Sequence, residues 1–148
     1  MTEHHLAQIN IGRFRLQPDD PLLKGFTDQL DAINALADSS PGFIWRLQDE
    51  EGNAQSIRAF DDPNMLINMS VWASMEALFD YTYKTAHTRI MSRRKEWFDL
   101  LQDAYMALWW IPAGHIPDPQ EGRERLDLLR EKGPGPDAFT FKQRFPAP

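Results

Sequence analysis

Two segments of the chain alternate between apolar and other residues, and this period of two constrains the fold most. Residues 6–14 and 65–72 each place every second side chain on one face, which is typical of strands. The purely apolar faces comprise Ala7, Ile9, Ile11, Ile67, Met69 and Val71. The mixed faces comprise Gln8, Asn10, Asn68, Ser70 and Trp72. A sheet with one apolar and one mixed face is therefore expected.

Helices are predicted where apolar residues recur every three or four positions. Asp20 is placed to cap a helix that begins at Pro21 and continues to Ala37. Ser74 is placed to cap a second helix, which reaches about Tyr83 and then continues or restarts through residue 101. The capping box at residues 118–121 begins a third helix, which ends before Gly133.

Further strands are predicted at residues 43–48, 105–111 and 138–145, with a short one at 55–60. The order is then β-α-β-β-α-β, followed by an extra late helix and strand. This order predicts an α+β, ferredoxin-like fold in one domain over residues 1–148.

The mixed face predicts a cavity. The apolar strand faces are expected to pack against the helices, leaving the mixed face open, and Arg46 is assigned to this open face together with Ile44. A second copy that covered this face would enclose a barrel with a few polar groups inside, which is the usual anatomy of a ligand site. The alternative interpretation is an ordinary face that contacts solvent.

Composition excludes several functions. The net charge of −6 disfavours binding to nucleic acid, and the absence of cysteine excludes disulfides and thiolate metal sites. The first ten residues do not resemble a signal peptide, and no apolar run approaches the roughly 20 residues of a membrane helix. We therefore expect a cytoplasmic protein that binds neither nucleic acid nor membrane.

Several segments resemble known families. The strand and helix at residues 71–91 resemble the dimeric α+β barrel superfamily, which includes the antibiotic biosynthesis monooxygenases and the haem-degrading monooxygenases. More narrowly, a bacterial family of uncharacterised activity in that superfamily is similar at residues 45–63, 92–98, 107–117 and 133–141. The resemblance implies a dimeric α+β barrel, and hence a homodimer that encloses a small-molecule site.

The cofactor-independent monooxygenases of the superfamily supply one set of site residues. In them an asparagine and a tryptophan four residues apart near a strand end bind and activate a phenolic substrate, and Asn68 and Trp72 have this spacing. An arginine and a tyrosine assist there, for which Arg46, Tyr81 and Tyr83 are candidates. Packing of Trp72 in the core is the alternative.

The haem-degrading branch supplies another set. There a helix histidine binds the iron and a first-strand asparagine lies nearby, which His87 and Asn10 resemble. The helix tryptophan of that branch has no counterpart here, and the segment before His87 is shorter. A general base and a core histidine are the other interpretations of His87.

The remaining aromatic candidates are assigned more loosely. Trp109 and Trp110 point to opposite faces of one strand, so one enters the core and the other the cavity or a dimer contact. His115 lies in a loop at the rim of the predicted barrel, as a substrate contact or as a structural residue. His4 and His5 are expected in a frayed terminus.

Three functions remain open. The first is a cofactor-independent monooxygenase that acts on a small aromatic or polyketide-like molecule, in which His87 or a water removes a proton and Asn68, Trp72 and Arg46 hold the anion. The second is a non-catalytic module that holds a small hydrophobic ligand. The third is a haem-binding or haem-degrading protein.

Overall fold

Four antiparallel strands form one sheet in the order β2-β3-β1-β4. The computed structural model describes residues 3–15, 20–21, 24–48, 65–84, 97–99 and 105–148. Its elements are β1 (His4–Arg13), α1 (Lys24–Ser39), β2 (Phe43–Arg46), β3 (Met65–Trp72), α2 (Met75–Lys84), β4 (Met106–Pro112) and α5 (Pro119–Lys132). The predicted α+β fold with β-α-β-β-α-β order is confirmed.

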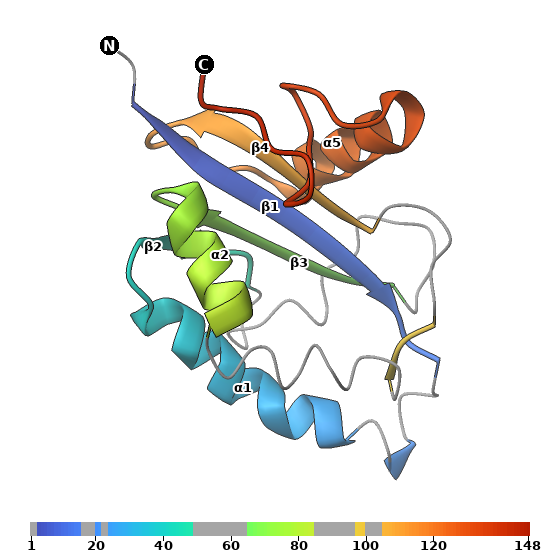
Figure 1. The fold of residues 1–148 in the computed structure, drawn as a ribbon. Coiled ribbons are helices and arrows are strands. Elements are labelled where there is room, and N and C mark those ends of the chain that lie inside the picture. Colours follow the sequence, from blue (N-terminus) through green and yellow to red (C-terminus); the bar gives the residue numbers. More distant parts are fainter. Residues whose placement is uncertain (1–2, 16–19, 22–23, 49–64, 85–96, 100–104) are drawn as a thin grey trace.

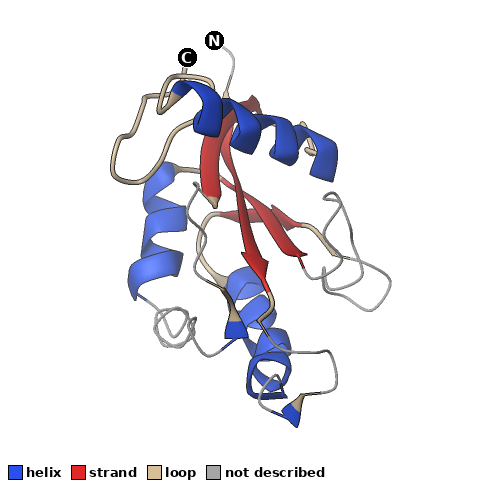
Figure 2. Ribbon diagram, turned by 90° about the vertical axis from the view of Figure 1, so that its right-hand side faces the viewer, coloured by secondary structure: helices blue, strands red, loops and turns tan. Residues whose placement is uncertain are grey.

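Helices cover both faces of this sheet. Helices α1 and α2 lie on one side, and α5 lies across β4 and β1 on the other side (Figures 1 and 2). In Figure 2 the sheet runs between these two layers of helix. Both faces are therefore occupied by elements of the same chain.

The apolar faces of the strands form the core beneath α5. The predicted apolar residues of β1 and β3 are at most 1% exposed, and Leu126 and Leu129 of α5 pack against them. Gly122 lets α5 approach closely, because a Cβ at this position would lie 2.9 Å from the Cδ1 atom of Ile9 and from the Sδ atom of Met69. Burial of one leucine side chain contributes about 1.5 to 3 kcal/mol.

The prediction for the mixed face is wrong in one respect. We expected a second copy to cover it, but α1 and α2 of the same chain do so. The apolar stripe that the sequence placed on α1 faces this side of the sheet, including Phe26, Leu30 and Ile33. The apolar stripe of α1 therefore packs against the mixed face of the sheet, whereas α5, the more polar helix, covers the apolar face.

A bulge in β2 corrects the assignment of Ile44. Phe43 pairs with Trp72, Trp45 with Val71, and the register shifts between Phe43 and Trp45. Ile44 is the extra residue and is 42% exposed. Arg46 consequently lies on the mixed face, as predicted, but Ile44 does not share that face.

The turn between α1 and β2 depends on Gly42. Its φ of +83° is a conformation that favours glycine. A Cβ there would lie 2.5 Å from the Cβ of Ala77 in α2, and the Gly42 carbonyl accepts a hydrogen bond of 2.7 Å from Ala73 N. Gly42 thus lets the turn pack directly against the start of α2.

Two of the three predicted helix caps are present, those at Ser74 and Asp118, whereas α1 begins at Lys24 and not at Pro21. The Ser74 hydroxyl accepts from Ala77 N at 3.1 Å, and the Asp118 carboxylate accepts from Glu121 N at 2.8 Å. In a complete capping box the Glu121 side chain would also accept from the backbone N–H of Asp118. Instead the Glu121 carboxylate accepts from Trp109 Nε1 at 2.9 Å and contacts His115 Nε2 at 2.7 Å. Glu121 therefore ties α5 to β4 and to the loop between them.

The predicted last strand at residues 138–145 is not formed. Phe139 exchanges two backbone hydrogen bonds of 2.8 Å with Leu108 and so covers the free edge of β4 at one point. Beyond it the chain turns, because Thr140 and Gln143 bond to each other. The alternating phenylalanines instead pack against one cluster on the mixed face.

Some predictions have other outcomes. His4 and His5 begin β1 and are not frayed. The short strand at residues 55–60 and the continuation of α2 beyond residue 84 as far as residue 96 lie outside the described residues, as does His87. No helix in the described part of the chain is long and apolar enough to cross a membrane.

Candidate functional site

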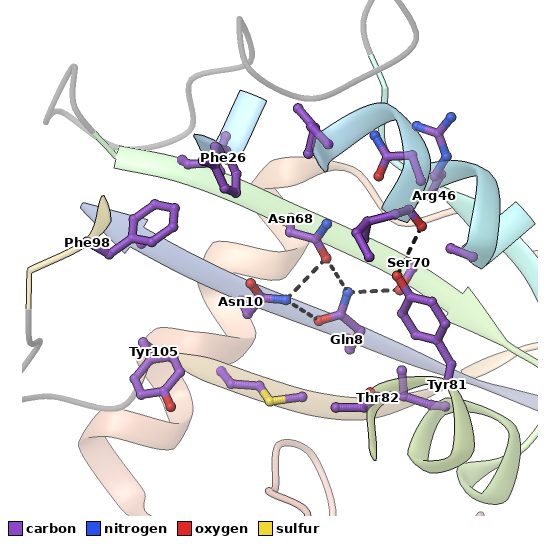
Figure 3. Close-up of a pocket in the computed structure, with 18 of the residues that line it drawn as sticks. Gln8, Asn10, Phe26, Arg46, Asn68, Ser70, Tyr81, Thr82, Phe98 and Tyr105 are labelled. Carbon is purple, nitrogen blue, oxygen red and sulfur yellow. Dashed lines mark hydrogen bonds between the residues drawn. The ribbon is translucent and has the colours of Figure 1, made fainter. Parts of the chain in front are cut away.

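A pocket lies between the mixed face of the sheet and the helices α1 and α2. Its volume is about 230 Å³. Side chains of β1 and β3 form its floor, and apolar side chains of α1 and α2 form its walls (Figure 3). Pockets for drug-sized ligands usually measure roughly 300 to 1,000 Å³, so this one suits a smaller molecule.

Four side chains on the floor form a hydrogen-bonded group, which we call the polar row: Gln8, Asn10, Asn68 and Ser70. Strand register places them in two opposed pairs, Gln8 with Ser70 and Asn10 with Asn68. Gln8 Nε2 donates to Asn68 Oδ1 at 2.7 Å and to Ser70 Oγ at 2.8 Å. Asn10 Nδ2 donates to Gln8 Oε1 at 3.0 Å and to Asn68 Oδ1 at 3.1 Å. Figure 3 shows the row across the two strands.

Trp72 closes the deep end of the pocket. It is fully buried, and its ring stacks on Tyr81 with centroids 4.9 Å apart. Its indole Nε1 donates to Ser70 Oγ at 2.8 Å. Trp72 therefore packs in the core and also donates to a polar group that lines the pocket, whereas its role in activating a substrate stays a prediction.

One cation lies at the pocket wall. Arg46 Nε donates to Asp38 Oδ1 at 2.8 Å, and the Arg46 side chain is 14% exposed. The lining residues that the structure describes include no carboxylate and no histidine. The pocket is thus suited to neutral or anionic molecules.

Tyr81 remains a neutral phenol under ordinary conditions. Burial raises its pKa above the usual range; the Arg46 guanidinium opposes this and the Asp38 carboxylate adds to it. Its hydroxyl donates to the carbonyl of Ile33 in α1 at 3.4 Å. Tyr81 is accordingly a structural donor and a stacking surface, and no base at neutral pH.

This raised pKa gives a testable consequence at high pH. Between the ordinary value of about 10 and its own higher pKa, folded Tyr81 keeps a proton that the unfolded chain has lost. The free energy of unfolding should therefore be unaffected by Tyr81 below about pH 10 and fall as pH rises further. Denaturant titrations at several pH values should give a smaller alkaline loss for Tyr81→Phe than for the wild-type chain. An equal loss in both would contradict the assignment.

The structure brings most of the predicted site residues together. Seven of them line this pocket: Gln8, Asn10, Arg46, Asn68, Trp72, Tyr81 and Tyr83. Tyr83 lies at the rim and is 44% exposed.

Three predicted residues lie outside the pocket. Trp109 is buried in the core under α5. Trp110 faces the same side as the pocket but is covered by the C-terminal segment, where its Nε1 donates to the Phe145 carbonyl at 2.8 Å. His115 is held by Glu121 beside α5, which favours the structural interpretation.

Sequence reasoning missed the part played by Ser70 and Asp38. Ser70 was placed on the mixed face without a role, although its position between Asn68 and Trp72 makes it their neighbour on that face. Asp38 directly follows the helix predicted at residues 21–37, and nothing in its local pattern indicates that α1 brings it to Arg46.

A haem group does not fit this pocket. The pocket volume of about 230 Å³ lies below the range for sites that hold drug-sized ligands. A porphyrin is itself as large as such a ligand. Within the described part of the chain, no three histidines or carboxylates gather in a way that could hold a metal ion.

A family model covers nearly the whole chain. The family is described as a domain of unknown function, DUF3291, and its model matches residues 5–148. No curated protein sequence matches the chain.

Solved structures share the fold. A mutant of SnoaB, described as a cofactor-independent oxygenase from Streptomyces nogalater, superposes with a TM-score of 0.50 at 13% identity and covers 77% of this chain and 98% of its own. Rv0793 from Mycobacterium tuberculosis gives 0.48 at 13% identity over 77% and 99% of the two chains. A protein of unknown function from Nitrosomonas europaea, NE2512, gives 0.48 at 11% identity over 80% and 99%.

Proposed function

Because the chain belongs to the DUF3291 family, a domain of unknown function, we propose its function from the pocket: it binds a small hydroxy-aromatic molecule and oxidises it with molecular oxygen. The observation that carries this proposal is the polar row beneath apolar and aromatic walls. Flat apolar walls suit an aromatic ring, and the row supplies hydrogen bonds along one edge of it. The fold shared with SnoaB, a cofactor-independent oxygenase, supports the same class of reaction.

The row can stabilise negative charge on a substrate oxygen. Asn68 lines the pocket and its Oδ1 accepts from Gln8 and Asn10, so its Nδ2 group is the donor that it can offer to a ligand. An amide and a hydroxyl held in place by such a network are donors of the kind that stabilise a developing oxyanion. Loss of a proton from a phenol makes its ring carbons electron-rich, and such a carbon reacts with oxygen.

The reaction balances without a further reductant. A hydroxynaphthalene would lose two hydrogens and gain one oxygen atom from O₂ to become a quinone, and the second oxygen atom would leave as water. His87 is the proposed base that removes the first proton, and this role stays a prediction from the sequence. Among the lining residues that the structure describes there is no carboxylate and no imidazole that could take this role.

Oxygen uptake with 1-naphthol tests the proposal. We expect one O₂ to be consumed for each naphthoquinone formed, measured with an oxygen electrode and by quinone absorbance. His87→Ala should lower the rate by about 100-fold or more, the usual contribution of a general base, whereas His115→Ala, which lies outside the pocket, should not change it. A chain that fails to bind 1-naphthol would refute the proposal.

A second candidate is a non-catalytic binding module. The absence of a carboxylate or imidazole among the described lining residues favours it. Binding of 1-naphthol without oxygen uptake would select this candidate. A homodimer, a single domain over the whole chain and a cytoplasmic location also stay predictions from the sequence.

A further inference from the structure

The Ser70 hydroxyl has its acceptor capacity filled by two nitrogen donors. Gln8 Nε2 and Trp72 Nε1 each donate to its Oγ at 2.8 Å. A serine hydroxyl has two acceptor lone pairs and one hydrogen to donate. The hydroxyl can therefore only donate to a further partner, and it donates no hydrogen bond to the residues that the structure describes.

This donor is fixed in place. Ser70 is 7% exposed and lines the pocket, and both residues that donate to it are buried, Gln8 at 3% and Trp72 at 0% exposure. Stacking on Tyr81 holds the Trp72 ring, and the amides of Asn10 and Asn68 hold Gln8. The Oγ atom consequently cannot turn its lone pairs toward a ligand without breaking one of these bonds.

We infer that Ser70 determines the specificity of the pocket: it selects ligands that present a hydrogen-bond acceptor, a carbonyl or phenolate oxygen, at the deep end. Trp72 is then a positioning residue, which acts through Ser70. This inference rests on the proposed function, because it concerns the same pocket. A buried donor discriminates strongly since an analogue without the acceptor leaves it unpaired.

Three bicyclic probes of similar size separate the contributions: 1-indanone offers only an acceptor, indole mainly a donor, and indene neither. We expect the wild-type chain to bind 1-indanone about fivefold to tenfold more tightly than indene, the range of one hydrogen bond. Isothermal titration calorimetry or ligand-observed NMR gives the two dissociation constants.

Variants at one position assign the effect. Ser70→Ala should bring the ratio for 1-indanone and indene close to one and leave the ratio for indole and indene unchanged. Ser70→Thr keeps the hydroxyl and should keep the discrimination. Each ratio is measured within a single variant, so a change in the folded fraction cancels, and partial destabilisation of Ser70→Ala does not obscure the result.

Each outcome decides the inference. Equal binding of 1-indanone and indene by the wild-type chain would overturn the selectivity assigned to Ser70 and leave the aromatic-binding pocket standing. A preference that Ser70→Ala retains would overturn it as well, because another donor would then be responsible. Failure of all three probes and of 1-naphthol to bind would remove the proposed function together with the inference.

Discussion

Replacing Trp109 with alanine is expected to lower the free energy of unfolding by about 3 to 5 kcal/mol, the usual cost of truncating a buried tryptophan. Trp109 is fully buried beneath α5, among the apolar residues of β1 and β3. The substitution would also remove the hydrogen bond of 2.9 Å from its Nε1 to the Glu121 carboxylate. Urea denaturation followed by far-UV circular dichroism measures the loss.

The neighbouring tryptophan is the matched control. Trp110 lies on the opposite face of β4 and is only partly buried. Trp110→Ala is therefore expected to cost about 1 to 2 kcal/mol, toward the centre of the distribution for single substitutions. A larger loss for Trp110→Ala than for Trp109→Ala would mean that β4 faces the other way and that α5 does not cover the core described above.

Replacing Asn68 with aspartate is expected to lower the rate of oxygen uptake by about 100-fold or more, the usual cost of losing one oxyanion donor. Aspartate has nearly the same shape and still accepts from Gln8 and Asn10, so the polar row should remain in place. The Nδ2 donor would be replaced by a carboxylate oxygen, which repels a developing phenolate. Initial rates with 1-naphthol at neutral pH measure the effect.

Asn34→Asp tests whether the loss of rate expected for Asn68→Asp comes from the lost donor or from the added charge alone. Asn34 lines the wall that α1 forms and is not part of the polar row. The substitution Asn34→Asp adds the same charge to the pocket without removing a donor from the floor. We therefore expect a smaller loss of the oxygen-uptake rate than for Asn68→Asp. Equal losses in the two variants would show that any negative charge in the pocket inhibits, and the donor role of Asn68 would be abandoned.

The strands were predictable because alternation is a local property. The side chains of β1 and β3 follow the period of two without interruption, so their faces are assigned correctly from the sequence. The polar row follows directly, since its members occupy alternate positions on these two strands. The bulge at Ile44 is not local in this sense, because it depends on how β2 pairs with β3.

The cover of each face could not be predicted from the strands. Helices α1 and α2 each have an apolar stripe, and such a stripe could also pack on the apolar face of the sheet. The sequence does not say which face of the sheet each helix covers. A Cβ at position 122 would lie 2.9 Å from side-chain atoms of Ile9 and Met69, so a glycine at this position lets α5 pack closely on the apolar face, although only a few residues of α5 are apolar.

The C-terminal segment was misassigned for a related reason. Alternating phenylalanines at residues 139, 141 and 145 resemble a strand, but the bond between Gln143 N and the Thr140 hydroxyl turns the chain within this stretch. The rings still reach one cluster on the mixed face, although the backbone does not form the predicted strand.

An NMR titration with 1-naphthol tests the central claim, a ligand site on the polar row, most directly. The chain contains five tryptophans, whose indole N–H signals are observed in the same ¹⁵N spectrum as side-chain amides. We expect the signals of Trp72 and of the amides of Gln8, Asn10 and Asn68 to shift with one saturating binding curve, while that of Trp109 stays in place. Shifts at Trp109 without shifts in the polar row would place the ligand elsewhere and contradict the account.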